Sequence, residues 1–330
     1  METVRLGAVG LGWFGGVLAE AAHASGEAEV VACFARSEEG RRAFADAHAC
    51  EPKESLESML GDSTIQGVIL ATPHSTHADL IEQAADAGKH VFVEKPLALT
   101  VADARRAIDA AERAGVTLQV GHNRRRQPAN RRIRSMVESG ELGTIVQLEG
   151  FHSSPGAHKP DLPAWRKDPA ECPAGGMTAL GVHTVDTFNY LVGPAARLVA
   201  FSKKVAGTSG LDEATAISIE YESGPIGQIG TSYFVPGLVS LAVYATDQNV
   251  WNEEDGSRLF TQGRADKARA EQPVDQLDTI QDEVVEFARC IRDGSRPETG
   301  GPAGLEVAVV LQGIMQSLES GRTVELAPLR

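Results

Sequence analysis

Residues 6–15 read LGAVGLGWFG, and this stretch decides the fold. The apolar run at residues 6–9 predicts a short buried strand that ends directly in a glycine-rich turn. Apolar side chains then recur with helical spacing through residue 22, and Gly26 stands where a glycine commonly ends a helix. Residues 29–34 are apolar again and predict a second buried strand. The stretch therefore predicts a strand–helix–strand unit.

The three glycines of the turn fit a dinucleotide-binding motif. Gly10 permits the tight turn, Gly12 lets the backbone approach a pyrophosphate, and Gly15 lets helix and strand pack closely. The amino end of the helix stabilises the phosphate charge. A glycine-rich turn without a ligand is the alternative, which the flanking strand and helix disfavour.

The choice of cofactor depends on the end of the second strand, where NAD-binding chains usually carry an acidic residue. This chain has Ala35, Arg36 and Ser37 there, with no carboxylate to repel a 2′-phosphate. A guanidinium and a hydroxyl favour NADP(H) over NAD(H), and Arg41 or Arg42 offers a second cation. The alternative is that Arg36 is a solvated surface residue and that Ser37 only caps the next helix.

Further strand-like runs lie at residues 67–71, 90–93 and 117–120, and helical patterns separate them. This alternation predicts a parallel, doubly wound sheet that binds ligands at the carboxyl ends of its strands. Besides Gly10 and Arg36, those ends carry residues 71–74, 94–96 and 121–123.

The remainder of the chain shows a different pattern. A polar, basic helix at about residues 127–140 precedes a strand near residues 146–151 and a long proline-rich loop, residues 154–173. Loops of this length are often functional, although a packed or subunit-contact loop is the alternative for this one. Strand-like runs without intervening helices predict an antiparallel sheet, at residues 198–205, 214–221, 226–234 and 239–245.

We therefore expect an α/β protein of two domains. Residues 1–122 form an NADP-binding Rossmann domain with a doubly wound parallel sheet. Residues 123–330 form a catalytic, substrate-binding and oligomerisation domain, α+β in class, on a large, mostly antiparallel open sheet. Apolar stripes at residues 284–291 and 307–318 predict helices that serve packing.

Composition limits the partners of this 330-residue chain. Its formal net charge of −14 argues against nucleic acid or an anionic membrane surface as the main partner. No apolar run is long enough to span a bilayer. The four cysteines are far apart and form no C-x-x-C pair, which favours a reducing, cytoplasmic location. His74 and His77 lack further ligands nearby in sequence, so we expect no metal site.

The chain resembles the Gfo/Idh/MocA family of oxidoreductases, named for glucose–fructose oxidoreductase and inositol dehydrogenase. The resemblance covers nearly the full length, and the order and spacing of its motifs are specific. The motifs are the turn at residues 10–15, residues 71–77, 94–96, the arginine-rich stretch after Gly121, Trp165-Arg166, Gly175-Gly176, and residues 181–186 and 317–322.

The resemblance implies hydride transfer between a nicotinamide and a CH–OH or C=O group of a sugar, polyol, cyclitol or cyclic dihydrodiol. Lys95 would lie beside the nicotinamide and the reacting oxygen, with Glu94 orienting it. His183 would be the general acid or base. A surface salt-bridge lysine and a buried structural histidine are the alternatives. The family also commonly forms homo-oligomers, here a dimer or tetramer through the C-terminal sheet.

One position departs from the family pattern. Many members carry an aspartate four residues before the catalytic histidine, where this chain has Ala179. Thr178, Asp186 or a residue near Asp161 is a candidate replacement. The gap also admits two other functions: an NADP-binding regulatory or sensor protein with the same fold, and a lyase or hydrolase that uses the nicotinamide transiently.

The sequence thus predicts two catalytic residues, Lys95 and His183, and a polar small-molecule substrate. The predicted cofactor-binding residues are Gly10, Leu11, Gly12, Trp13, Phe14, Arg36, Ser37, Arg41, Thr72, Pro73, His77, Glu94, Lys95, Asn123, Trp165 and Arg166.

Overall fold

The computed structural model describes residues 2–207 and 210–330. In this described part the chain forms two compact units. The first unit runs to Asn123 and also includes Asp278–Leu305, and the second contains Arg124–Leu277 and Glu306–Arg330. The first division lies one residue from the predicted boundary. The return of residues 278–305 to the first unit was not predicted.

The first unit contains, among the described residues, a sheet of six strands in the order β3-β2-β1-β4-β5-β6, all paired in parallel. The predicted doubly wound parallel sheet is confirmed. Its strands are β1 (Val4–Val9), β2 (Ala28–Phe34), β3 (Glu51–Pro52), β4 (Gly67–Leu70), β5 (His90–Glu94) and β6 (Leu118–Gly121). Its helices are α1 (Trp13–Ser25), α2 (Glu38–His48), α3 (Leu56–Leu60), α4 (His77–Asp86), α5 (Val101–Ala114) and α8 (Thr279–Asp293).

Local sequence signals explain the helix ends in this unit. Gly26 and Gly115 end α1 and α5 in the left-handed conformation, as glycine at these positions allows. The side chains of Ser37 and Thr100 accept hydrogen bonds from the first turns of α2 and α5.

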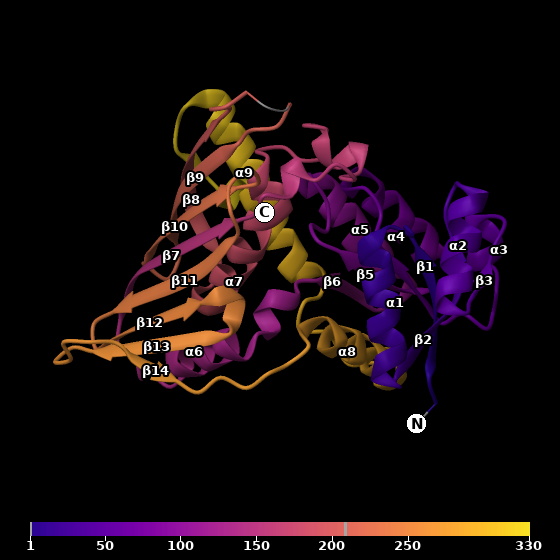
Figure 1. The fold of residues 1–330 in the computed structure, drawn as a ribbon, viewed down its shortest axis with the longest axis horizontal. Coiled ribbons are helices and arrows are strands. Elements are labelled where there is room, and N and C mark those ends of the chain that lie inside the picture. The colour runs from indigo at the N-terminus through magenta and orange to yellow at the C-terminus, as the bar shows by residue number, and fades with distance from the viewer. Residues whose placement is uncertain (1, 208–209) are drawn as a thin grey trace. The chain divides into compact units, whose positions relative to one another are not determined.

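Helix α8 belongs to the first unit because its apolar stripe completes that unit's core. Val284, Phe287 and Ala288 are buried in one cluster with side chains of β1, β2 and α1. Figure 1 shows α8 beside α1. The sequence reveals the stripe on α8 but not its packing partner, because these segments lie more than two hundred residues apart.

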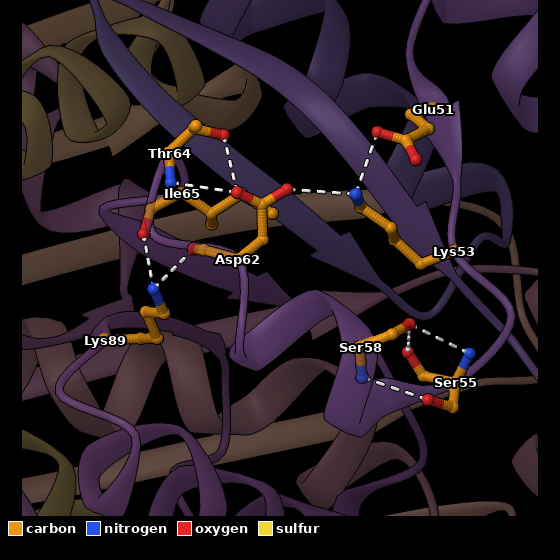
Figure 2. A network of polar contacts seen from close by, with 8 residues as sticks. All are labelled: Glu51, Lys53, Ser55, Ser58, Asp62, Thr64, Ile65 and Lys89. Carbon is orange, nitrogen blue, oxygen red and sulfur yellow. Dashed lines mark hydrogen bonds and ion pairs between the residues drawn. The ribbon is translucent and has the colours of Figure 1, made fainter.

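A polar network fixes the crossover from β3 to β4 (Figure 2). Lys53 Nζ donates to Glu51 Oε2 at 2.8 Å and to Asp62 Oδ2 at 2.9 Å. These bonds hold the pKa of the Asp62 carboxyl well below its usual range and raise the pKa of Lys53. Lys89 Nζ donates to the carbonyls of Asp62 and Ile65, and burial lowers its pKa. The network ties the loop before β4 to the start of β5.

The second unit is built on a sheet of nine described strands, in the order β14-β13-β12-β11-β7-β10-β9-β8-β15. All pairs are antiparallel except β7 with β10, so the predicted mostly antiparallel sheet is confirmed. The strands are β7 (Ile145–Ser153), β8 (Ala195–Lys203), β9 (Ala214–Tyr221), β10 (Ile226–Ser232), β11 (Leu238–Ala245), β12 (Gln248–Glu253), β13 (Arg258–Gly263), β14 (Ala270–Gln272) and β15 (Val324–Glu325).

Helices α6 (Pro128–Glu138) and α7 (Val182–Val192) pack on this sheet, and the carboxyl half of α9 (Gly301–Ser320) packs against β8 (Figure 1). Glycines in the strands let α7 lie close to them. A Cβ at Gly150 would be 2.4 Å from Thr184, and one at Gly227 would be 3.2 Å from the Phe188 ring. Because these positions are glycine, α7 can pack closely over β7 and β10.

Strands β12, β13 and β14 were not predicted, because their outer positions carry polar and charged residues. The Arg258 guanidinium stacks over the Phe260 ring at 4.7 Å, and that of Arg269 over the Trp251 ring at 4.3 Å. Pairs of this kind stabilise a strand without the alternation of apolar residues that identifies one in sequence. No helix in the described ranges is long and apolar enough to cross a membrane.

Candidate functional site

The glycine turn lies at the carboxyl end of β1 and has the geometry that its motif predicts. Gly10 has a φ of 89°, and a Cβ there would lie 2.3 Å from the carbonyl oxygen of Ala71. A Cβ at Gly15 would lie 2.2 Å from the carbonyl oxygen of Gly10. At Gly12, by contrast, a Cβ would meet no atom within 4 Å. The turn is closed to side chains at two glycines and open at the third, where a cradle for a pyrophosphate requires space.

The residues around Gly12 differ in whether their side chains face solvent or the core. Gly12 is the N-cap of α1, and no side chain caps this helix end. Trp13 is 82% exposed. Leu11 and Phe14 pack instead against the core cluster of the first unit. The side chains of Leu11 and Phe14 are thus directed to the core, whereas Trp13 offers both backbone and ring to a ligand.

The end of β2 carries the residues predicted to read the 2′ position of the ribose. Arg36 is exposed, and its guanidinium makes no hydrogen bond within the described part of the chain. Ser37 caps α2, since its hydroxyl oxygen accepts from the amide of Gly40 at 3.2 Å. The hydroxyl proton remains available for donation. Arg41 donates to the carbonyl of Ala35 at 2.7 Å, while Arg42 pairs with Glu38 on the exposed face of α2.

The end of β4 is held by His77. This side chain is fully buried, with Nδ1 lying 2.9 Å from the carbonyl of Pro96 and Nε2 lying 3.1 Å from the carbonyl of Thr72. Its ring therefore links the ends of β4 and β5 and does not offer a nitrogen to a ligand. Its predicted place among the cofactor contacts stays a prediction. Thr72 and Pro73 are half-buried at the strand end.

The ends of β5 and β6 lie side by side. Lys95 follows β5 directly and is half-buried. A Cβ at Gly121 would lie 2.7 Å from Glu94 Oε1, so the Glu94 carboxylate covers the last residue of β6. Asn123 Nδ2 donates to the hydroxyl of Thr279 at the start of α8, at 3.0 Å. The side chain of Asn123 is thus used within the first unit.

In the second unit, His183 lies in the first turn of α7, after a π-helical turn at Met177–Gly181. Single π-helical turns are frequent at functional sites. The candidate replacements for the aspartate missing at Ala179 are engaged elsewhere. The Thr178 hydroxyl donates to the carbonyl of Pro173, and Asp186 accepts two hydrogen bonds from Arg125 at 2.5 and 3.1 Å. Asp161 is exposed.

A polar cavity lies within the second unit next to His183. His152 of β7 also lines it, and the centroids of the two imidazole rings are 5.9 Å apart. His152 was not predicted from the sequence. The alternation of Leu148, Gly150 and His152 along β7 was the signal that could have placed it on the buried face. The cavity is lined by Arg124, Gln127, Asn130, His152, His183, Thr184, Thr187, Val239, Ser240, Leu241 and Asn252.

The second unit also contains an ion pair at Arg124 and a stacked pair in the long loop. Arg124 forms an ion pair with Asp255, and burial lowers the pKa of Arg124 to about 10. Trp165 and Arg166 lie in a short 3-10 helix of the long loop, with the guanidinium 4.4 Å from the indole. The described residues include no group of three or more His, Cys, Asp or Glu side chains placed to hold a metal ion.

Comparison with known proteins identifies the family. Residues 4–122 match the model described as "Oxidoreductase family, NAD-binding Rossmann fold", and residues 130–250 match the "GFO/IDH/MocA C-terminal domain". The chain belongs to the Gfo/Idh/MocA family. Its first unit is accordingly an NAD(P)-binding Rossmann domain, and members of this family act as dehydrogenases or reductases on sugars, polyols and cyclitols.

Relatives align with this family member over most of its length. The D-apiose dehydrogenase of Paraburkholderia graminis is 31% identical, covering 92% of this chain and 84% of its own. The 1,5-anhydro-D-fructose reductase of Ensifer adhaerens is 26% identical, covering 90% and 91%. A solved structure from Desulfitobacterium hafniense, described as a candidate NADPH-dependent oxidoreductase, is 30% identical with a TM-score of 0.93, covering 100% and 99%.

The geometry of the glycine turn predicts opposite effects of two substitutions. Gly12→Val adds a side chain to open space, so the melting temperature should change by less than about 2 °C. The same side chain fills the cradle, so affinity for both NADPH and NADH should fall at least about 100-fold. Fluorescence titration and thermal unfolding measure the two effects.

Gly10→Ala serves as the matched substitution in the same turn. Its Cβ clashes with the Ala71 carbonyl, so it should lower the melting temperature by several degrees. Wild-type cofactor affinity in Gly12→Val would contradict the placement of the pyrophosphate.

Proposed function

We propose that this protein is an NADP(H)-dependent oxidoreductase that transfers a hydride to or from a CH–OH or C=O group. The family supports the oxidoreductase class but not the choice of cofactor, since its relatives include enzymes named for NAD(+) and for NADP(+). The observation that carries NADP(H) is the end of β2. There, an exposed guanidinium at Arg36 and the donor hydroxyl of Ser37 stand where an acidic residue would repel a 2′-phosphate.

The proposed arrangement at β2 uses Arg36 as the mobile phosphate ligand and Arg41 as a fixed neighbour. The hydrogen bond from Arg41 to the Ala35 carbonyl holds its guanidinium at the turn, where it adds positive potential. Ser37 supplies a directed donor while it caps α2. A planar guanidinium suits a phosphate because it donates two parallel hydrogen bonds.

The substrate class we propose is a sugar, polyol, cyclitol or cyclic dihydrodiol. D-apiose and 1,5-anhydro-D-fructose, for which two relatives are named, are neutral and rich in oxygen. The cavity beside His183 agrees with such a substrate because amides, hydroxyls and imidazoles form most of its lining. Trp165 and Arg166 are proposed as further contacts from the long loop of the second unit.

The proposed catalytic residues are Lys95 and His183. The bound nicotinamide supplies the hydride acceptor or donor. For each hydride moved from a carbinol, one proton must leave its hydroxyl, and an imidazole near neutral pH accepts it readily. We assign this role to His183. The Lys95 ammonium stabilises negative charge on the reacting oxygen, and Glu94 positions Lys95. His77, through its bonds to Thr72 and Pro96, supports the strand ends that carry these groups.

One observation favours a second candidate function. Ala179 replaces a carboxylate, and both Thr178 and Asp186 are committed to other partners. A protein that binds NADP(H) and a polar ligand as a sensor, without turnover, would tolerate this loss. A lyase or hydrolase with transient nicotinamide chemistry is distinguished by product formation without net change in cofactor redox state.

Turnover is the test of the proposed function. Wild-type protein, NADP+ or NADPH, and a panel of aldoses, ketoses, inositols, linear polyols and cyclic dihydrodiols should give a change in nicotinamide absorbance with at least one substrate. Lys95→Met should then lower kcat/KM by at least about 100-fold, the usual effect of removing one donor to a developing oxyanion. The exposed Lys267→Met is the charge-matched control and should match wild type. Tight NADPH binding without turnover across the panel would favour the sensor.

Cofactor preference is tested at the β2 turn. Arg36→Ala should weaken NADPH binding by about 10- to 100-fold, the effect of losing a charge-assisted hydrogen bond, and should leave NADH affinity within about 3-fold. Arg42→Ala removes the same charge from the adjacent helix α2, but Arg42 is paired with Glu38, so this substitution should have little effect. Equal losses of NADPH affinity in the two variants would show that Arg36 acts through the overall positive charge and not through a direct contact with the phosphate.

We also propose a homo-oligomer, a dimer or tetramer, formed through the sheet of the second unit. Phe201, Ala216, Gly230 and Phe151 are cross-strand neighbours on β8, β9, β10 and β7. Phe201 is 69% exposed and Phe151 36% exposed, with only small residues between them. A Cβ at Gly313 of α9 would lie 3.4 Å from the Leu198 side chain, and Phe201 lies three residues further along β8, so its side chain points to the face away from α9. An apolar row of this kind suits a second copy.

Light scattering tests this proposal. Wild type should show a multiple of the 35.0 kDa chain mass, and Phe201→Glu should shift it towards one chain. Leu277→Glu adds the same charge at an exposed apolar position outside the sheet and should leave the mass unchanged. A wild-type mass equal to that of one chain would contradict the proposed homo-oligomer.

A further inference from the structure

We propose that the cavity of the second unit is a recognition subsite for one hydrogen-donating hydroxyl group of a neutral, polyhydroxylated substrate, with Asn252 Oδ1 as its acceptor. The proposal deepens the proposed function and rests on it for the identity of the ligand as a substrate. It concerns a hydroxyl group other than the one that reacts at His183. Asn252 of β12 and His183 of α7 both line the cavity.

Three carboxamides beside the cavity form a chain whose direction is fixed at its outer ends. Gln127 Nε2 lies 2.9 Å from the Asp255 carbonyl oxygen and 2.8 Å from Asp255 Oδ1. Asn130 Nδ2 lies 2.8 Å from the carbonyl oxygen of Arg124. Carbonyl and carboxylate oxygens only accept, so the amide nitrogens of Gln127 and Asn130 must face them.

The orientation of Asn252 follows from these two. With their nitrogens committed, Gln127 and Asn130 present their carbonyl oxygens to Asn252. Asn252 must therefore turn its nitrogen towards them, and Nδ2 donates to Asn130 Oδ1 at 2.8 Å and to Gln127 Oε1 at 3.4 Å. Its Oδ1 is left on the other side. Rotating the amide would place two oxygens against each other, so the network itself excludes the opposite assignment.

Asn252 Oδ1 consequently lacks a donor. The residue is only 5% exposed and lines the cavity, and this oxygen has no hydrogen-bond partner among residues 2–207 and 210–330. Buried carbonyl oxygens nearly always accept a hydrogen bond, because leaving one unpaired is costly. Asn252 Oδ1 therefore needs a hydrogen-bond donor, which a hydroxyl group of a ligand supplies.

The charges around the cavity favour a neutral ligand. Arg124 is the cationic side chain in the lining, and Asp255 already pairs with it. Asp255 also accepts from Gln127, so one carboxylate anchors both the amide chain and the arginine. The Thr187 hydroxyl donates to the His183 carbonyl on its own helix. An anionic ligand would compete with Asp255 for Arg124, whereas a carbinol leaves the ion pair intact.

The backbone near Asp255 is shaped to keep this chain of amides in place. Gly256 has a φ of 91°, and a Cβ there would lie 2.7 Å from the Gln127 carboxamide. Only glycine allows the strand end and Gln127 to approach this closely.

The experiment replaces hydroxyl groups of the ligand one at a time. The probes are D-xylose, D-glucose and myo-inositol with their single deoxy and fluoro derivatives. Fluorine keeps the size of a hydroxyl but cannot donate. Dissociation constants come from saturation-transfer NMR with the full-length protein and NADPH, and kcat/KM is measured for every probe that turns over.

In the wild type, removal of one particular hydroxyl, by hydrogen or by fluorine, should weaken binding or kcat/KM by about 10- to 100-fold. In Asn252→Leu, which has similar volume and no acceptor, the parent and that derivative should differ by less than about 3-fold. Gln248→Leu is the matched control. Gln248 lies on the same strand and its Oε1 is also buried without a partner in the described ranges, but it lies outside the cavity lining, so the preference should persist.

Three results would overturn the subsite. In the first, no single hydroxyl of any bound probe matters in the wild type, a comparison that needs no variant and holds even if Asn252→Leu fails to fold. In the second, the deoxy derivative is penalised but the fluoro derivative is not, because the contact would then need an acceptor on the ligand. In the third, Asn252→Leu retains the full preference, as expected if Asn252 Oδ1 binds only water. Absence of turnover with hydroxyl-selective binding would reject the proposed enzyme and keep the subsite.

Discussion

The near contact between the backbone of Gly10 and the Ala71 carbonyl is the constraint on which the site in the first unit depends. The space that a Cβ would need at Gly10 is occupied by β4's continuation, and at Gly15 by Gly10 itself. Because both are glycines, β1 can turn into α1 directly at the sheet edge. The amino end of the helix is then bare at Gly12, where the turn stays open. The remaining strand ends, with Arg36, Thr72 and Lys95, follow from the parallel order around β1.

A similar constraint operates in the second unit. Gly150 and Gly227 remove the side chains that would hold α7 away from the sheet. This close packing brings the His183 ring near His152 and forms the polar cavity between α7, β11 and β12. The chain of amides then determines which hydrogen-bonding group remains for a ligand. Its amide nitrogens donate to Asp255, to the Arg124 carbonyl and to one another, and one acceptor oxygen is left over.

The features that the sequence predicted well are those with local causes. Gly10, Gly12 and Gly15 and the capping glycine at 26 act through neighbours a few residues away. The features it missed depend on distant partners. The stripe of α8 was recognised, but only the fold brings it to α1. His152 and the pairing of Asn130 with Asn252 depend on the register of β7, β11 and β12, which sequence alone does not fix. The position of the His77 ring between the carbonyls of Pro96 and Thr72 also depends on residues distant in sequence.

The most direct test of the account is a crystal structure of the protein grown in saturating NADPH. The account predicts the pyrophosphate on the backbone amides following Gly12, the 2′-phosphate in contact with Arg36 and Ser37, and the nicotinamide next to the Lys95 ammonium. A glycine turn without dinucleotide under these conditions, or a nicotinamide remote from residue 95, would contradict it.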